Sequence, residues 1–251
     1  MIQETFSIDG TPEIEVRIQS GRVDVTRGAP GTVKVTVETQ DADFYVEQRG
    51  NTIVASSEKN TPWLSRGSSF VAIETPEGSN VYVGAASARV DCELPLNRVE
   101  VKTASGDIEI DTAETVVVKS ASGDVKVGSV NKTLRLTSAS GSLLIDRCRG
   151  SVNISTASGD VHIEDSEAAM NVNTVSGDID ISRLTGKTAA FKSMSGSITV
   201  GIPRGSDVDL DVNLLSGRLN LPEPEPREGA PERVISIRAK SVSGDLMISR
   251  A

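Results

Sequence analysis

The 251-residue sequence contains little of what active sites and nucleic-acid interfaces are usually built from. Its one histidine, His162, excludes a metal site with several histidine ligands and leaves a Ser-His-Asp triad only one candidate base. Aromatic residues make up 3% of the chain, so rings that stack on bases or sugars are scarce. Acidic residues outnumber basic ones by 35 to 26, and the net charge of −9 argues against nucleic-acid binding.

Cysteines and long apolar segments are scarce as well. Two cysteines, Cys92 and Cys148, are too few for the disulfide scaffold of a small secreted domain. The N-terminus has neither the basic leader nor the apolar region of a signal peptide. No apolar run approaches the roughly 20 residues that a membrane span needs. These features predict a cytoplasmic location and no membrane span.

One short motif dominates the chain: Ser-Gly-Asp, or a close variant, followed by alternating aliphatic residues. Clear copies are TASGDIEI at Thr103, TASGDVHI at Thr156 and TVSGDIDI at Thr174. Three successive intervals between the motif glycines are 18 residues long, and the later intervals are longer. The motif glycines are Gly106, Gly123, Gly141, Gly159, Gly177, Gly196, Gly217 and Gly244.

Each repeat has room for two short strands joined by a turn. Residues Val152–Thr156 alternate apolar and polar side chains, which is the periodicity of a strand. Ala157–Asp160 has turn chemistry, because glycine adopts backbone angles that other residues resist. Val161–Ile163 then alternates again. Aligned repeats place aliphatic residues in four columns, with polar residues between them, so one side of every strand is predicted to be buried.

A single repeat cannot bury its apolar side, whereas stacked repeats can. We therefore predict an all-β fold: a single-stranded parallel β-helix, or β-solenoid, with about 18 residues per coil. The chirality preference of parallel crossovers predicts a right-handed coil. A β-sandwich is the main alternative, since it also contains many short strands. It gives no reason for one tripeptide to return at a nearly constant step.

The predicted organisation is a single solenoid domain without a persuasive amphipathic helix. A proline-rich acidic stretch must leave the stack, because proline cannot occupy a central ladder. The predicted parts of the domain 1–251 are irregular N-terminal coils over 1–98 with a protruding loop at 56–69, regular repeats over 99–200, and C-terminal coils over 201–251 with the proline-rich insertion at 222–231.

A column of aspartates follows the motif glycines and is the one candidate metal site. Some parallel β-rolls bind Ca²⁺ through Gly-x-Asp repeats, so a calcium ladder is one interpretation. Turn chemistry is the preferred interpretation, because serine or arginine interrupts the column in several repeats. We expect no cofactor. The aspartates of the weaker calcium interpretation are Asp107, Asp124, Asp160 and Asp178.

His162 is predicted to point outward from a strand, beside Leu144 and Asp180 of the adjacent repeats. A catalytic base needs an oriented partner and a nucleophile within reach, so a surface histidine is the simpler interpretation. Outward acids such as Glu109 and Asp180 keep a carbohydrate-active β-helix enzyme as an alternative. The same columns mix lysine, threonine, serine and asparagine, which favours a solvated surface. We therefore predict no catalytic residues.

Two further features concern the interior. Cys92 occupies an aliphatic column and is interpreted as a small buried hydrophobic residue, whereas Cys148 sits at a corner, so we predict no disulfide between them. A column of hydroxyl residues points inward beside each turn, where we expect its members to bond along the stack. The column comprises Thr103, Ser120, Ser138, Thr156, Thr174 and Ser193.

Trp63 and its apolar neighbours Leu64 and Phe70 form the one segment that looks like a contact anchor. Lone tryptophans are enriched at protein interfaces. A solenoid must also cover the apolar core at its ends, so the second interpretation is that the segment covers one end of the core as a plug. Both interpretations stay open, with the plug preferred.

The recurring Ser-Gly-Asp-Ile/Val-x-Ile/Val motif resembles the bacterial family of β-strand-repeat proteins described as putative adhesins, a domain of unknown function. The resemblance covers most of the chain and is strongest from about Val99 to Val200. It implies a parallel β-helix and carries over no catalytic residues. We expect a non-enzymatic interaction scaffold with an unknown protein or glycan partner. The alternatives are a carbohydrate-active enzyme and a solenoid that self-assembles through its ends.

Overall fold

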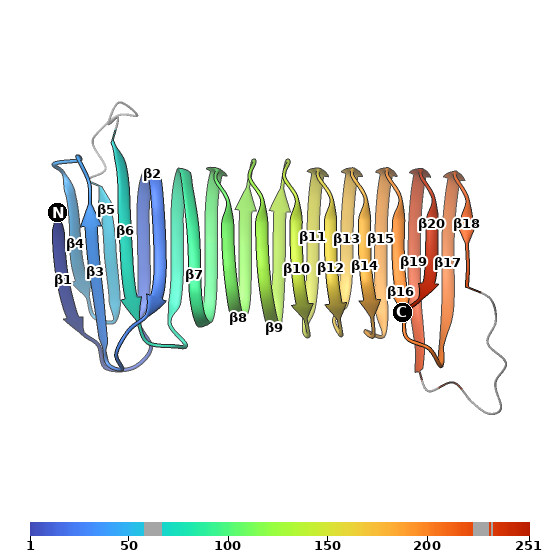
Figure 1. The fold of residues 1–251 in the computed structure, drawn as a ribbon, viewed down its shortest axis with the longest axis horizontal. Coiled ribbons are helices and arrows are strands. Elements are labelled where there is room, and N and C mark those ends of the chain that lie inside the picture. Colours follow the sequence, from blue (N-terminus) through green and yellow to red (C-terminus); the bar gives the residue numbers. More distant parts are fainter. Residues whose placement is uncertain (58–66, 223–230, 232) are drawn as a thin grey trace. The chain divides into compact units, whose positions relative to one another are not determined.

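The computed structural model describes residues 1–57, 67–222, 231 and 233–251, and the regular elements in these ranges are all β-strands (Figure 1). The all-β prediction is thereby confirmed. No helix in the described ranges is long and apolar enough to cross a membrane. The predicted loop 56–69 is shorter than expected, since strands occupy both of its ends, and residues 58–66 lie outside the described ranges.

The chain divides into two compact units, Met1–Lys126 and Val127–Ala251, which we call unit 1 and unit 2. Strand β9, Val125–Ser138, begins at the end of unit 1 and continues in unit 2. The strands of unit 1 are β1 Ile2–Ser7, β2 Glu13–Arg27, β3 Thr32–Glu38, β4 Phe44–Arg49, β5 Thr52–Ser57, β6 Ser68–Thr75, β7 Asn80–Ser105 and β8 Ile108–Ser120. The further strands of unit 2 are β10 Leu143–Cys148, β11 Ser151–Ser158, β12 Val161–Ser166, β13 Ala169–Ser176, β14 Ile179–Leu184, β15 Thr188–Ser195, β16 Ile198–Ile202, β17 Ser206–Ser216, β18 Leu219–Asn220, β19 Arg233–Ser243 and β20 Leu246–Arg250.

Unit 1 combines parallel and antiparallel pairing. Strand β2 pairs in parallel with β5, β6 and β7, and β7 pairs in parallel with β8. In contrast, β1 pairs antiparallel with β3, β3 with β6, and β4 with β5. The expectation of irregular but parallel coils over 1–98 is therefore wrong for these strands. The short turn at Gly50, with φ of +63°, lets the chain reverse so that β5 pairs antiparallel with β4, which a parallel crossover does not allow.

Unit 2 contains two series of parallel strands. One series runs β9, β11, β13, β15, and the other runs β10, β12, β14, β16. Leu143 pairs with Val161 and Val161 with Ile179, so paired residues are 18 positions apart in the sequence. A Ser-Gly turn joins each strand of the first series to one of the second, and we call such a two-strand segment a repeat.

The last repeat in the chain is not the last repeat in space. Strand β19 pairs with β15 on one side and with β17 on the other, and β20 lies between β16 and β18 in the same way. The C-terminal repeat β19–β20 is therefore inserted ahead of β17–β18. Within the described residues, β17 and β18 each pair on one side only, so β17–β18 is the edge repeat of unit 2 (Figure 1).

The predicted aliphatic columns form the core of each unit. In unit 1, Val90 pairs with Ile108, and both side chains are at most 1% exposed. In unit 2, Val161, Ile179 and Ile198 form an equally buried column. Alternation along the strands thus sets which side is dry, as the sequence predicts.

Candidate functional site

The aspartate column is a hydrogen-bonding ladder that runs along the turns. The Asp124 N–H donates to Asp107 Oδ1 at 3.1 Å, and the Asp178 N–H donates to Asp160 Oδ1 at 2.9 Å. Asp178 Oδ1 accepts in turn from the N–H of Ser197 at 2.7 Å. Each of these carboxylates therefore satisfies a backbone donor in the next repeat. Within the described ranges, no group of three or more acidic, histidine or cysteine side chains is placed to hold a metal ion.

We expect Asp178→Ala to lower the free energy of unfolding by about 1 kcal/mol, because the Ser197 N–H loses its charged acceptor. Asp178→Asn keeps an acceptor oxygen and should lose less. Urea denaturation measures both variants, and adding Ca²⁺ or a chelator should leave the unfolding midpoint of the unchanged protein where it is. A midpoint that rises with Ca²⁺ would instead support the calcium ladder.

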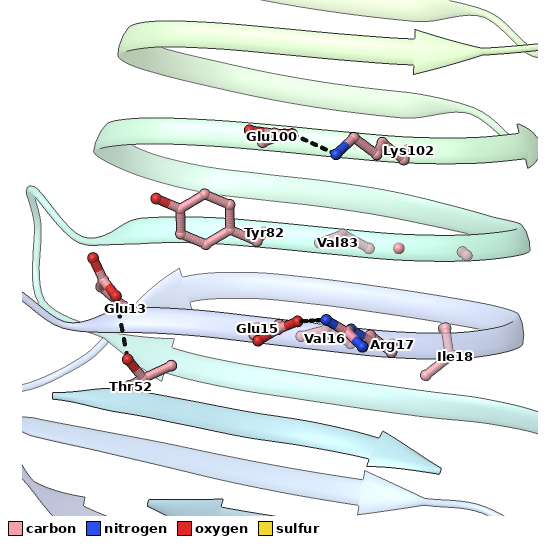
Figure 2. A pocket seen from close by; sticks show the side chains of 12 residues that line it. Glu13, Glu15, Val16, Arg17, Ile18, Thr52, Tyr82, Val83, Glu100 and Lys102 are labelled. Atoms are coloured by element: carbon pink, nitrogen blue, oxygen red, sulfur yellow. Dashed lines mark hydrogen bonds and ion pairs between the residues drawn. The ribbon is translucent and has the colours of Figure 1, made fainter. Parts of the chain in front are cut away.

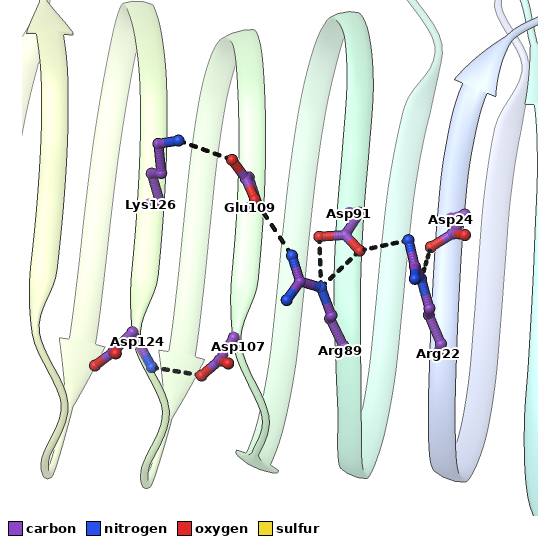
Figure 3. A network of polar contacts seen from close by, with 8 residues as sticks. All are labelled: Arg22, Asp24, Arg89, Asp91, Asp107, Glu109, Asp124 and Lys126. Atoms are coloured by element: carbon purple, nitrogen blue, oxygen red, sulfur yellow. Dashed lines mark hydrogen bonds and ion pairs between the residues drawn. The ribbon is translucent and has the colours of Figure 1, made fainter.

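A second polar cluster in unit 1 is a chain of alternating charges (Figure 3). Asp91, which is 5% exposed, accepts two hydrogen bonds from Arg89 Nε and lies 3.2 Å from Arg22 Nη2. Hydrogen bonds from Arg22 to Asp24 and from Arg89 to Asp91 raise the pKa of both guanidinium groups. Glu109 bridges to Arg89 and to Lys126, which lies 2.9 Å away.

Strand register explains why this cluster is needed. Asp24 pairs with Asp91, and Asp91 with Glu109, so three acids lie side by side on neighbouring strands. The arginines at the adjacent outward positions neutralise them. This arrangement is a mutually compensated ion network, and Glu109 is one of its structural members.

A hollow of about 560 Å³ opens on the outward side of unit 1 (Figure 2). Strands β2 and β7 position its walls, because Glu15 pairs with Tyr82 and Arg17 with Gly84. Glu15 forms an ion pair with Arg17, and Glu100 forms one with Lys102 at 2.8 Å. The full lining comprises Glu13, Glu15, Val16, Arg17, Ile18, Thr52, Tyr82, Val83, Gly84, Ala85, Glu100 and Lys102.

Two of the acidic groups of this hollow accept hydrogen bonds from neighbouring side chains. Hydrogen bonds from Lys102 and Arg98 lower the pKa of Glu100. The Glu13 carboxylate accepts a hydrogen bond from the Thr52 hydroxyl at 3.2 Å. A general acid needs a raised carboxyl pKa, so Glu100 is suited to binding rather than to proton donation.

The edge repeat of unit 2 exposes the side of its strands that other repeats bury. Ile235 and Ile237 of β19 are fully buried, whereas their partners Val208 and Leu210 of β17 are half-buried. Leu246 of β20 is likewise buried, while its partner Leu219 of β18 is 46% exposed. The open side of this repeat is lined by Val208, Leu210, Val212, Leu214, Leu219 and Leu221.

An exposed apolar row accompanies this edge along the Ser-Gly turns. Ser176 pairs with Ser195, Ser195 with Ser243, and Ser243 with Ser216, so the residues immediately before these serines lie on adjacent strands. Equivalent positions earlier in the chain are alanines, such as Ala157. The members of the row and their exposed fractions are Val175 50%, Met194 56%, Val242 46% and Leu215 80%.

Several sequence predictions are located by the structure. His162 lies between Leu144 and Asp180, as predicted, with its Nδ1 3.3 Å from the Asp180 carboxylate. Cys92 and Cys148 are both 1% exposed, and burial raises the pKa of each thiol to about 12. Cys92 is thus a buried packing residue, and Cys148 is buried at its corner.

The inward hydroxyl column bonds differently from the prediction. Thr103 Oγ1 donates to the carbonyl oxygen of Ser105 at 2.7 Å, and Ser138 Oγ donates to that of Ser140 at 2.8 Å. The hydroxyls of Thr103, Ser120, Ser138 and Thr156 therefore close their own turns and do not bond along the stack. The reason is local geometry, since the carbonyl two residues ahead lies nearer than any group of the next repeat. The buried hydroxyls of Thr174 and Ser193 have no hydrogen-bond partner among the described residues.

Of the predicted contact anchors, Trp63 and Leu64 lie outside the described residues. Phe70 is half-buried in β6, paired with Arg22 on one side and Glu38 on the other. Sequence reasoning did not find the hollow or the edge repeat. The signals were present, because Gly84 interrupts an alternating strand and the alanine before Ser-Gly becomes valine, methionine or leucine in the last repeats.

Comparison of the sequence with known protein families identifies the family of this chain. Residues 11–249 match the profile of the Toastrack DUF4097 family. The chain belongs to that family. The resemblance to β-strand-repeat proteins described as putative adhesins is thereby confirmed. Comparison of the Toastrack chain with curated proteins finds no match.

Solved structures share the fold of this Toastrack chain. A putative adhesin from Bacteroides fragilis NCTC 9343 matches with a TM-score of 0.53 and 17% identity, covering 98% of this chain and 95% of that chain. A putative adhesin from Parabacteroides distasonis ATCC 8503 matches with a TM-score of 0.50 and 15% identity, covering 96% of each chain. At these identities the likeness establishes the fold alone.

Proposed function

We propose that this protein is a non-enzymatic interaction scaffold that binds an extended segment of a partner protein along strand β17. The observation that carries the proposal is the edge repeat, whose apolar side is half-open where the equivalent columns of β19 and β20 are closed. The names of the two similar structures, both putative adhesins, support a binding role. We also propose that the chain is a single-domain, right-handed parallel β-helix with about 18 residues per coil. The 18-residue spacing of paired residues in unit 2 supports this proposal.

Strand β17 offers what strand addition requires. It has 11 residues and pairs on one side only within the described ranges, so from Val208 to Ser216 its other edge presents backbone N–H and C=O groups. Proteins usually protect such an edge, because it is a template for another strand. A partner strand laid on β17 would bond these groups and cover the half-buried apolar column.

The charges of β17 indicate which segment fits. Asp207, Asp209 and Asp211 occupy alternate exposed positions, opposite the apolar side of the strand. Asp211 forms an ion pair with Arg238 of β19 at 2.8 Å, so the charge argument rests chiefly on Asp209. A second copy of β17 would bring two such aspartate rows together, which like-charge repulsion opposes. A segment in which lysine or arginine alternates with aliphatic residues matches both sides, since side chains alternate with a period of two. We therefore expect a basic, alternating partner segment.

Binding, rather than catalysis, also suits the acids of the chain. Glu109 belongs to a compensated ion network, and hydrogen bonds keep Glu100 ionised. Asp180 contacts His162, which also lies 3.4 Å from Glu164, and both carboxylates are exposed. Glu100, whose pKa is lowered, is poorly suited to general acid catalysis.

The test is titration with a labelled peptide of alternating lysine and valine, followed by fluorescence anisotropy. We expect saturable binding of one peptide per chain and no binding of the matching glutamate–valine peptide. Asp209→Lys should weaken binding about tenfold by placing a like charge against the peptide. Asp180→Lys, which reverses an exposed acid on β14, is the matched control and should bind normally.

Two results would contradict the proposal. Binding of neither peptide would remove strand addition. A mass by light scattering that doubles with concentration, and returns to the monomer value in Asp209→Lys or Leu215→Ser, would assign the edge to a second copy of the chain instead.

A further inference from the structure

A glycine that the backbone does not need creates the hollow on unit 1. Gly84 lies within β7 and is absent from the glycines with positive φ. A Cβ at this position would meet only Arg17 Cγ, at an ordinary distance of 4.0 Å. Glycine weakens a strand because it has no side chain to pack. At this position its effect is to leave room above the strand, since the backbone conformation does not require glycine. The space is the hollow itself.

Two of the three acids that line the hollow are neutralised by a neighbouring base, and the third, Glu13, accepts a hydrogen bond from Thr52. On one side Glu15 pairs with Arg17, and on the other Glu100 pairs with Lys102. Among the described residues, the ion pairs of Arg17 and Lys102 stay within their own walls and do not cross the hollow, as the two dashed lines in Figure 2 show. Each wall therefore presents both hydrogen-bond donors and acceptors, already fixed in position by its own pair.

Tyr82 supplies an apolar surface between these walls. It pairs with Glu15 across the strands, and Figure 2 shows its ring flat beside the ribbon of β7. Val16 and Val83 also border the hollow, but their side chains are at most 3% exposed and belong to the core, so the Tyr82 ring supplies the exposed apolar face. An aromatic face with a few fixed polar groups around it is the usual composition of a small-molecule site, and 560 Å³ is a usual size.

This composition selects the class of ligand. An anion would approach the carboxylates of Glu13, Glu15 and Glu100. A cation would approach Arg17 and Lys102, so a net charge of either sign is opposed. Hydroxyl groups both donate and accept, and so match both members of each pair. A neutral ring with hydroxyls on its rim and C–H groups on its face satisfies the walls and Tyr82 together. We infer that the hollow binds a neutral sugar unit of a glycan.

The inference is tested by following unit 1 amide signals by NMR during titration with glucose, galactose, mannose and N-acetylglucosamine. We expect saturable shifts around Tyr82 with at least one of them. Gly84→Lys restores the residue type found at Lys102 and Lys119 and should abolish binding by filling the hollow. Tyr82→Ala should weaken binding about tenfold through loss of the ring surface. Tyr45→Ala, which changes the other tyrosine, is the control.

Three results would overturn the inference: no saturable shift with any of the four sugars, unchanged sugar binding in Gly84→Lys, or tighter binding of inorganic phosphate than of every sugar. Unaltered melting of Gly84→Lys shows that a loss of binding reflects the filled hollow. Binding of the lysine–valine peptide to β17 should be unaffected in Gly84→Lys, so the two sites stand or fall separately.

Discussion

Gly123→Ala is expected to lower the free energy of unfolding by about 2–6 kcal/mol. Gly123 has a φ of +115°, outside the region that side chains tolerate, and forcing another residue there costs about 1–3 kcal/mol. A Cβ would also collide with the backbone carbonyl oxygen of Gly106, a contact that only movement of the main chain relieves. Such overpacking adds about 1–3 kcal/mol. Urea denaturation followed by circular dichroism measures the loss.

The control separates the two contributions. Gly50 also has a positive φ, +63°, but nothing lies within 4 Å of the position its Cβ would take. Gly50→Ala should therefore cost only the conformational term of about 1 kcal/mol. Equal losses in Gly123→Ala and Gly50→Ala would show that the close approach of successive turns does not constrain the motif glycine.

Phe191→Ala is expected to destabilise unit 2 by about 3–5 kcal/mol. Phe191 is the largest fully buried side chain of the described core and stands between Val172 and Ala239 in its column. Truncation would leave a ring-sized cavity in a rigid stack, where parallel strands on both sides resist collapse. Thermal and urea unfolding monitor the change.

Met194 provides the matched comparison on the same strand. It is 56% exposed, so Met194→Ala removes little buried area and should change stability by less than about 0.5 kcal/mol. The double variant Phe191→Ala with Ala239→Leu should recover part of the loss, because the neighbouring strand would then fill the space. A small loss in Phe191→Ala alone would mean that the columns are loosely packed.

The regular part of the fold was predictable because it depends on patterns within a few residues, namely the alternation of apolar and polar side chains and the turn glycine. Alternation within Val152–Thr156 and Val161–Ile163 selects the buried side, and the glycine between them selects the turn. The repeat then implies which residues pair, since identical columns bury best in register. The N-terminal strands β1, β3 and β4 lack that repetition, so their antiparallel pairing had no register signal in the sequence.

The candidate sites depend on neighbours that are distant in sequence. The missing side chain of Gly84 leaves a hollow because Arg17 lies opposite it on β2. The alternating pattern around Gly84 does not identify that partner strand. Turn hydroxyls such as Thr103 had two plausible acceptors, and backbone geometry selected the nearer one. The aspartate column, in contrast, was interpreted as turn chemistry from local pattern alone, and the carboxylates of Asp107, Asp160 and Asp178 each accept from a backbone N–H of the next repeat.

By itself the sequence determined the all-β character, the dry columns and the glycine turns, since these follow from periodicity and local backbone sterics. Only the tertiary structure decided that β19–β20 enters ahead of β17–β18, because all repeats carry similar columns and pattern alone does not rank them in space. The small Ala239 leaves room beside the Phe191 ring, whereas Val212 at the same column of β17 is larger. That difference in side-chain volume favours β19 beside β15 and leaves β17 at the edge, with its apolar side open.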